Sequence, residues 1–70
     1  MSDHVYRLSE IVGSSAESVD DAIRNAVRKA SETLRNIEWV QTEEIRGQVV
    51  EGNVAYFQVT VKVGFRLDQE

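Results

Sequence analysis

The sequence predicts a small α+β protein with the order β-α-β-β, in which a three-stranded antiparallel sheet is partly wrapped around one helix. Three segments mix apolar and polar residues as strands do, with clear alternation in the last of them, and one segment has the three- and four-residue apolar spacing of an amphipathic helix. A glycine-asparagine pair separates the last two strands. The chain has 70 residues and no proline, repeat or low-complexity run, so residues 1–70 are expected to form a single domain.

The first predicted strand covers Val5 to Val12 and is followed by Gly13-Ser14-Ser15, a run that is typical of a turn. A helix is expected next, from Val19 to Asn36, because Ser18 and Asp21 have the spacing of a capping pair. At ~1.5 Å per residue this helix is about 27 Å long. Its apolar face consists of residues that recur at helical spacing: Val19, Ala22, Ile23, Ala26, Val27, Ala30, Leu34 and Ile37.

Two long strands are predicted after the helix, from Trp39 to Val50 and from Val54 to Leu67, joined by a two-residue turn at Gly52-Asn53. Alternate residues of the second strand are apolar, so one face of this strand is expected to receive the helix. At ~3.4 Å per residue each arm reaches roughly 40 Å, well beyond the helix. Uncovered apolar residues in so small a domain, which has no cysteine, predict self-association.

The composition argues against several classes of function. Twelve acidic and eight basic residues give a formal charge of -4, which disfavours binding to nucleic acid or to a membrane surface. The N-terminus lacks the features of a signal peptide, and a cytoplasmic location is the default. No nucleophile, metal-binding or phosphate-loop motif is present, and the adjacent Glu43 and Glu44 are expected to point to opposite faces of a strand. The sequence therefore predicts a protein that is not an enzyme, with no catalytic residue and no metal site.

The predicted turn also gives a register for the hairpin. If Gly52 and Asn53 form a strict two-residue turn, Trp39 lies opposite Arg66, and both share with Gln58 the sheet face away from the helix. An indole, a guanidinium and a carboxamide suit a planar heterocycle that carries polar groups. From composition alone, however, packing of Trp39 in a subunit interface is the simpler interpretation, and the arginines could pair with neighbouring acids.

Beyond these patterns, the chain closely resembles the bacterial dodecins over nearly its whole length and in the same order. The resemblance is carried by five runs: Tyr6-Arg7, Glu10-Ile11-Val12-Gly13-Ser14-Ser15, Asn36-Ile37-Glu38-Trp39, Ile45-Arg46-Gly47-Gln48-Val49-Val50-Glu51-Gly52, and Phe57-Gln58-Val59-Thr60-Val61-Lys62-Val63-Gly64-Phe65-Arg66-Leu67. It implies a hollow homododecamer that binds flavin without catalysing a reaction. In this family, pairs of flavins are stacked between tryptophans at subunit interfaces, and the stacked rings quench flavin photochemistry.

The resemblance also implies roles for individual residues. Trp39 matches the stacking tryptophan, Gln58 the glutamine that hydrogen-bonds the polar edge of the flavin, and Arg46 and Arg66 the arginines near the flavin site, which favours FMN as the ligand. A structural shell, or a carrier of another aromatic nucleotide such as coenzyme A, is the alternative. The strict register places Arg46 on the helix side, so its contact with flavin requires a bulge, a strong twist or another subunit's site.

Overall fold

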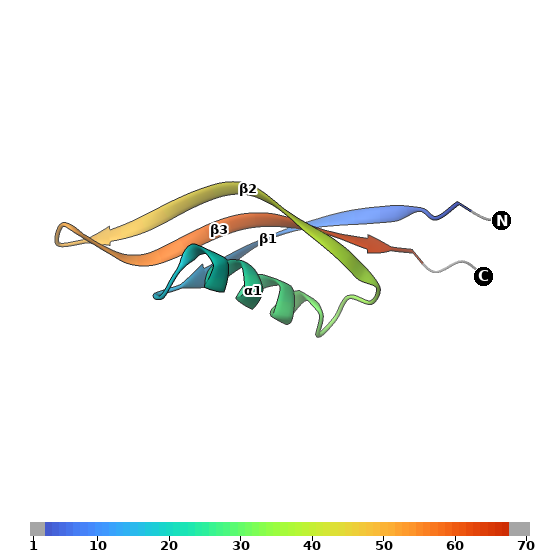
Figure 1. Ribbon diagram of the computed structural model, residues 1–70, viewed down its shortest axis with the longest axis horizontal. Helices are drawn as coiled ribbons and strands as arrows, with labels where there is room; N and C mark the ends of the chain where they lie inside the picture. Colours follow the sequence, from blue (N-terminus) through green and yellow to red (C-terminus); the bar gives the residue numbers. More distant parts are fainter. Residues whose placement is uncertain (1–2, 68–70) are drawn as a thin grey trace.

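A computed structural model of the protein describes residues 3–67 and shows a long, twisted sheet with one helix against one of its faces (Figure 1). The elements are β1 (Tyr6–Ser15), α1 (Val19–Ala30), β2 (Ile37–Val50) and β3 (Asn53–Arg66). The sheet order is β1-β3-β2, and β3 pairs antiparallel with both neighbours. The predicted β-α-β-β order and the antiparallel sheet are confirmed.

The hydrophobic core lies between α1 and the central strand β3. Val59, Val61 and Val63 are fully buried, and Ala22 and Ala26 of α1 pack against this row. Alanines on the buried face of α1 allow the helix backbone to approach the sheet closely, because their side chains add little bulk. The predicted apolar face of the second hairpin strand is therefore the face that meets the helix, as expected.

The first strand is longer than the sequence predicted, because Gly13, Ser14 and Ser15 belong to β1 and not to a turn. Gly13 lies directly under α1, where a Cβ atom would overlap the carbonyl oxygen of Ala22 and would lie 2.7 Å from the Cβ of Ala26. The side chain of Ser15 is buried; its hydroxyl donates to Asp21 at 2.7 Å. These residues therefore fix the contact between β1 and the helix, and the turn begins after them.

The helix is shorter than predicted, since it ends at Ala30 and not at Asn36. The capping prediction is confirmed: the Ser18 side chain accepts a hydrogen bond from the backbone N–H of Asp21 at 3.1 Å. Beyond the helix, the Ser31 hydroxyl donates to the Arg28 carbonyl at 2.8 Å, a local bond that competes with further helical turns. Asn36 has a positive φ of 65°, which redirects the chain into β2.

The hairpin turn lies one residue earlier than predicted. Glu51 and Gly52 have φ values of 52° and 79°, and Val50 pairs with Asn53, so the two turn residues are Glu51-Gly52 and not Gly52-Asn53. Glycine is thus the second of the two turn residues, as it is in the common Asn-Gly turns of tight hairpins. Asn53 instead begins β3, and its side-chain amide donates to the Glu51 carbonyl at 3.4 Å.

Strand β2 is largely uncovered, because α1 packs against β1 and β3. Every residue from Glu38 to Val50 is exposed, including Val40 and Ile45, which pair with the buried Val63 and Val59. The molecule extends over 56 Å, and the tip of the hairpin projects well past the helix (Figure 1). The predicted overhang of apolar strand residues is confirmed. Among the described residues, no helix is long and apolar enough to cross a membrane.

The close contact at Gly13 leads to a stability prediction. Gly13→Ala is expected to lower the free energy of unfolding by about 1–3 kcal/mol, because the new methyl group forces α1 away from β1. Gly47→Ala is the matched control, since its Cβ would lie 3.0 Å from a methyl group of the exposed Val54 and 3.7 Å from the Tyr56 carbonyl oxygen, with no overlap of backbone atoms; it is expected to cost about 0.5 kcal/mol or less. Denaturant unfolding of both variants at equal protein concentration measures the difference. Equal losses would show that the helix can move aside without cost.

Candidate functional site

The sheet face that points away from α1, here named the outer face, carries all four residues that the sequence singled out. On β3 it is formed by the residues that alternate with the row of buried valines, and this set includes Gln58 and Arg66. On β2, Trp39 pairs with Gly64 and Arg46 pairs with Gln58, so both lie on this face as well. The predicted opposition of Trp39 to Arg66 is wrong because the turn residues are Glu51-Gly52; the two pairing shifts between this turn and Trp39 cancel each other.

A β-bulge explains why Arg46 shares a face with Trp39. The pairing shifts between Thr42, which is opposite Val61, and Glu44, which is opposite Thr60, so Glu43 is an additional residue on β2. One additional residue reverses the alternation of every later side chain in the strand. The strict register, counted from the turn, placed Arg46 on the helix side. An earlier pairing shift, between Val49 opposite Val54 and Gln48 opposite Tyr56, makes Ala55 an additional residue on β3 and moves Arg46 to the outer face.

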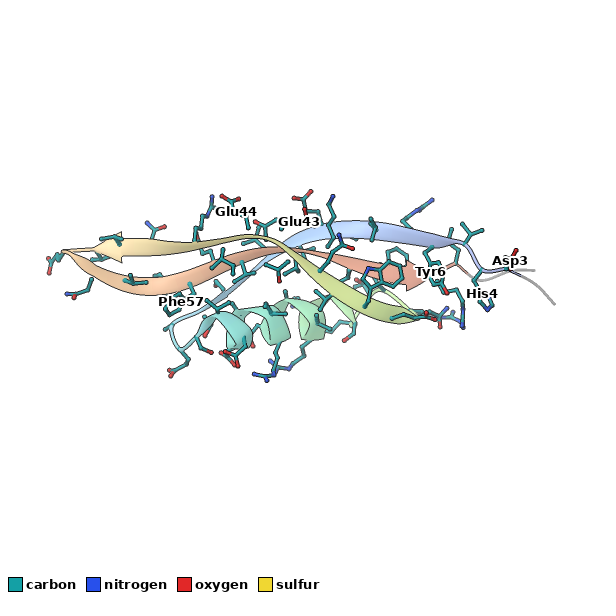
Figure 2. All side chains as sticks on the ribbon, turned by 45° about the horizontal axis from the view of Figure 1, so that its top comes forward. Asp3, His4, Tyr6, Glu43, Glu44 and Phe57 are labelled. Carbon is teal, nitrogen blue, oxygen red and sulfur yellow. The ribbon has the colours of Figure 1, made fainter. Side chains whose placement is uncertain are left out.

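The same bulge corrects the expectation for the adjacent glutamates. Glu43 and Glu44 both lie opposite Thr60 and both project from the outer face, and Figure 2 shows them on the side of the sheet away from the helix. They were predicted to point to opposite faces, which holds for a regular strand but not for the two residues of a bulge.

Arg46 and Gln58 form the first of two groups on the outer face, here named the Gln58 pair. The guanidinium Nε of Arg46 donates to Oε1 of Gln58 at 3.2 Å across the two strands. Since the amide oxygen accepts from arginine, the amide Nε2 is the group that presents donors to a ligand. The pair thus offers hydrogen-bond donors and a positive charge side by side.

Trp39 is the centre of the second group, here named the Trp39 cluster, which contains Trp39, Tyr6, Gln41, Gly64 and Arg66. The indole lies flat over Gly64, where a Cβ atom would overlap the ring. The Tyr6 ring packs edge-on against the indole, with centroids 5.2 Å apart and an interplanar angle of 63°. Trp39 nevertheless stays 39% exposed, and because Gly64 covers the ring from β3, the accessible part of the indole lies on the side away from that strand.

Polar contacts surround the indole in this cluster. Its N–H donates to Oε1 of Gln41 at 3.0 Å, and Nε2 of Gln41 donates to Oε2 of Glu43 at 3.1 Å. On the other side, Nη1 of Arg66 lies 3.3 Å from Oε2 of Glu38, and both side chains are a little over one-third exposed. Ion pairs this exposed contribute little to stability, so Arg66 remains able to contact an anion.

The two groups are far apart within one chain. Gln58 and Gly64 are six positions apart on β3, which at ~3.3 Å per residue is about 20 Å, and Trp39 lies beside Gly64. A groove on the helix side does not connect them; it is lined by Ile11, Val12, Ala26, Lys29, Ala30, Glu32 and Thr33. A single copy of the chain therefore holds two separate parts of a site.

Sequence reasoning missed three members of the Trp39 cluster. Tyr6, Gln41 and Gly64 were not assigned any role in binding. Gly64 carried a usable signal, because an isolated glycine inside a strand often marks a close approach by another group. Gln41 carried none, since its contact with Trp39 depends on the rotamers of two exposed side chains.

The sequence and the fold of the chain are both similar to those of known proteins. A family model of the dodecins matches residues 5–68. The dodecin of Thermus thermophilus is 43% identical over 65 residues, which are 93% of this chain and 94% of that protein. The solved dodecin from Streptomyces davaonensis is 54% identical with a TM-score of 0.93, over 97% of this chain and 100% of that one. The solved dodecin from Streptomyces coelicolor is 50% identical with a TM-score of 0.93, and each chain is covered completely.

The contact between Gly64 and the indole can be tested in the protein without any ligand. Gly64→Ala is expected to lift the Trp39 ring off β3, because the methyl group takes the position that the ring occupies. Tryptophan emission then moves to longer wavelength and acrylamide quenches it more strongly. The sequence contains one tryptophan, so the signal reports this ring alone. Unchanged emission and quenching in Gly64→Ala would contradict the stacked geometry, and Gly47→Ala serves as the control.

Proposed function

The chain belongs to the dodecin family, and we propose that it binds, stores and sequesters FMN as a homododecamer without catalysing a reaction. The observation that supports this most directly is the open face of the Trp39 indole. One ring face lies on Gly64 and the N–H is bonded to Gln41, so the remaining face is the part of the indole that a ligand can contact. A flat, apolar ring face suits stacking with another planar ring, and an isoalloxazine is such a ring.

Assembly of several copies is the second part of the proposal. The gap of about 20 Å between Trp39 and Gln58 is much longer than three fused six-membered rings. A flavin stacked on Trp39 of one subunit therefore meets the Gln58 pair of another subunit. The bare apolar residues of β2 support such contacts, since exposed surface of this kind is usually covered by a partner.

The charges of the outer face favour a flavin with a phosphate group. The whole chain has a formal charge of -4, so an anionic ligand needs a local positive group. Arg46 and Arg66 supply that charge on the same face as the indole, and a guanidinium matches phosphate geometry well. The donors of Gln58 suit the carbonyl groups on the polar edge of the flavin.

Stacking explains why storage is a coherent function for this face. Free flavin is photoreactive, and an indole in contact with the ring quenches its excited state and keeps it from other reactants. We assign no catalytic residue, and within residues 3–67 no three His, Cys, Asp or Glu side chains are grouped to hold a metal ion. We propose that this storage takes place in the cytoplasm.

The first test replaces the stacking ring. Trp39→Ala is expected to weaken FMN binding by about 1–3 kcal/mol, roughly five- to 150-fold in Kd, and to relieve the quenching of the flavin that still binds. Assembly is expected to persist, because the ring packs against the neighbouring strand β3 of its own subunit. Native mass and fluorescence titration are measured on one preparation. A wild-type protein that is monomeric and ignores FMN contradicts the proposal, and preferential binding of coenzyme A favours the carrier alternative.

The second test asks whether the two groups act across subunits. Shells made only of Trp39→Ala or only of Gln58→Ala subunits have no complete site. When the two variants are co-expressed, some sites combine an intact Trp39 from one subunit with an intact Gln58 from another, and part of the FMN binding is expected to return. Titration of mixed shells against each single-variant shell measures this recovery. Absence of recovery in assembled, mixed shells would mean that one subunit supplies both residues.

A further inference from the structure

The chain of hydrogen bonds beside the indole has a role that stacking alone does not require. We propose that Gln41, itself held by Glu43, is a positioning residue that fixes the in-plane orientation of Trp39 and thereby the way a planar ligand lies on it. This inference rests on the stacking role proposed above for Trp39.

The side chains of Trp39, Gln41 and Glu43 are linked by two hydrogen bonds that run in one direction, from the indole to the carboxylate. Trp39, Gln41 and Glu43 are alternate residues of β2 and lie on the outer face together. A carboxylate only accepts hydrogen bonds, so the Gln41 amide turns its Nε2 toward Glu43, at 3.1 Å. Its Oε1 then faces the indole N–H, at 3.0 Å. With the amide reversed, both of these contacts would be lost.

The other neighbours of the indole do not supply this direction. Gly64 offers a flat backbone surface that supports the ring but has no side chain to distinguish one ring edge from another. Tyr6 packs edge-on as an aromatic ring and limits the tilt of the indole. The terminal torsion of a tryptophan side chain is broad, so a ring on a flat support can turn over. The bond to Gln41 selects the orientation in which the N–H faces along β2.

The bulge leaves this row of hydrogen bonds intact. Glu43 keeps the outer-face position that regular alternation from Trp39 and Gln41 gives it, and the alternation is reversed only after Glu43. The bond also occupies the only polar atom of the indole. A ligand on Trp39 therefore meets an apolar ring, and polar recognition is left to other groups such as the Gln58 pair.

The test uses Gln41→Leu, which keeps the size of the side chain but removes both hydrogen bonds. In the flavin-free protein, the near-ultraviolet circular dichroism of the single tryptophan is expected to fall strongly, since the ring is no longer held in one orientation. FMN affinity is expected to fall roughly three- to tenfold, the effect of one ordinary hydrogen bond. Gln48→Leu is the matched control, because Gln48 is an exposed glutamine on the same strand, opposite Tyr56.

Two variants of Glu43 test the second link of the chain. Glu43→Gln keeps an oxygen that accepts from Gln41 and is expected to retain the tryptophan signal. Glu43→Leu removes the acceptor and is expected to lose a large part of that signal. Native mass confirms in each case that assembly is unchanged. Because these two variants leave Gln41 in place, they decide the inference even if Gln41→Leu fails to assemble.

The outcomes separate this inference from the proposed function. A wild-type tryptophan signal in both Gln41→Leu and Glu43→Leu would overturn the positioning role, whatever FMN does. Loss of the signal with unchanged FMN affinity would overturn the link between orientation and binding. If the wild-type protein binds no FMN, the proposed function fails, whereas the signal of the flavin-free variants still decides whether Gln41 orients the ring.

Discussion

The alternation of side chains along β3 is the constraint on which the rest of the structure depends. As the central strand, β3 presents Val59, Val61 and Val63 to the helix and the residues between them to the outer face. The buried row holds α1, and the other row carries Gln58, Gly64 and Arg66. Because the hydrophobic core and the candidate site share one strand, a shift of one residue in the register of β3 would expose the core valines and bury the polar groups at the same time.

The sequence was sufficient to predict the parts of the fold that depend on repeated patterns. The alternation of β3 and the Ser18 cap follow from residue types at fixed spacing, and the structure agrees with both. The turn at Glu51-Gly52 and the bulge at Glu43 were missed, since each depends on where one residue is inserted and not on a repeat. The end of the helix was missed because the apolar spacing continues to Leu34, whereas the helix ends at Ala30 and the N–H groups of Glu32 and Thr33 bond to carbonyls only three residues back.

The missed turn and the missed bulge affected the prediction of the candidate site to different degrees. Trp39 and Gln58 were placed on the correct face, but Arg46 was placed on the wrong one, because a pairing shift at Gln48 and Val49 lies between it and the turn, and the bulge at Glu43 reverses the alternation again before Trp39. The partners of Trp39 were beyond the reach of sequence reasoning: Gln41 contacts the indole only in one combination of side-chain rotamers. Sequence patterns thus predicted which sheet face carries the candidate site, whereas the structure was needed to see how the residues of that site contact one another.

The strand order leaves β1 and β2 at the two edges of the sheet, and this places a demand on the protein while it is being made. A single subunit has open edges and bare apolar residues, and under the proposed function ordered association would have to compete in time with edge-to-edge aggregation. Stacking identical copies of β2 in register would bring Glu43 against Glu43 and Glu44 against Glu44. Like charges in such a stack repel, so the acidic bulge disfavours that arrangement.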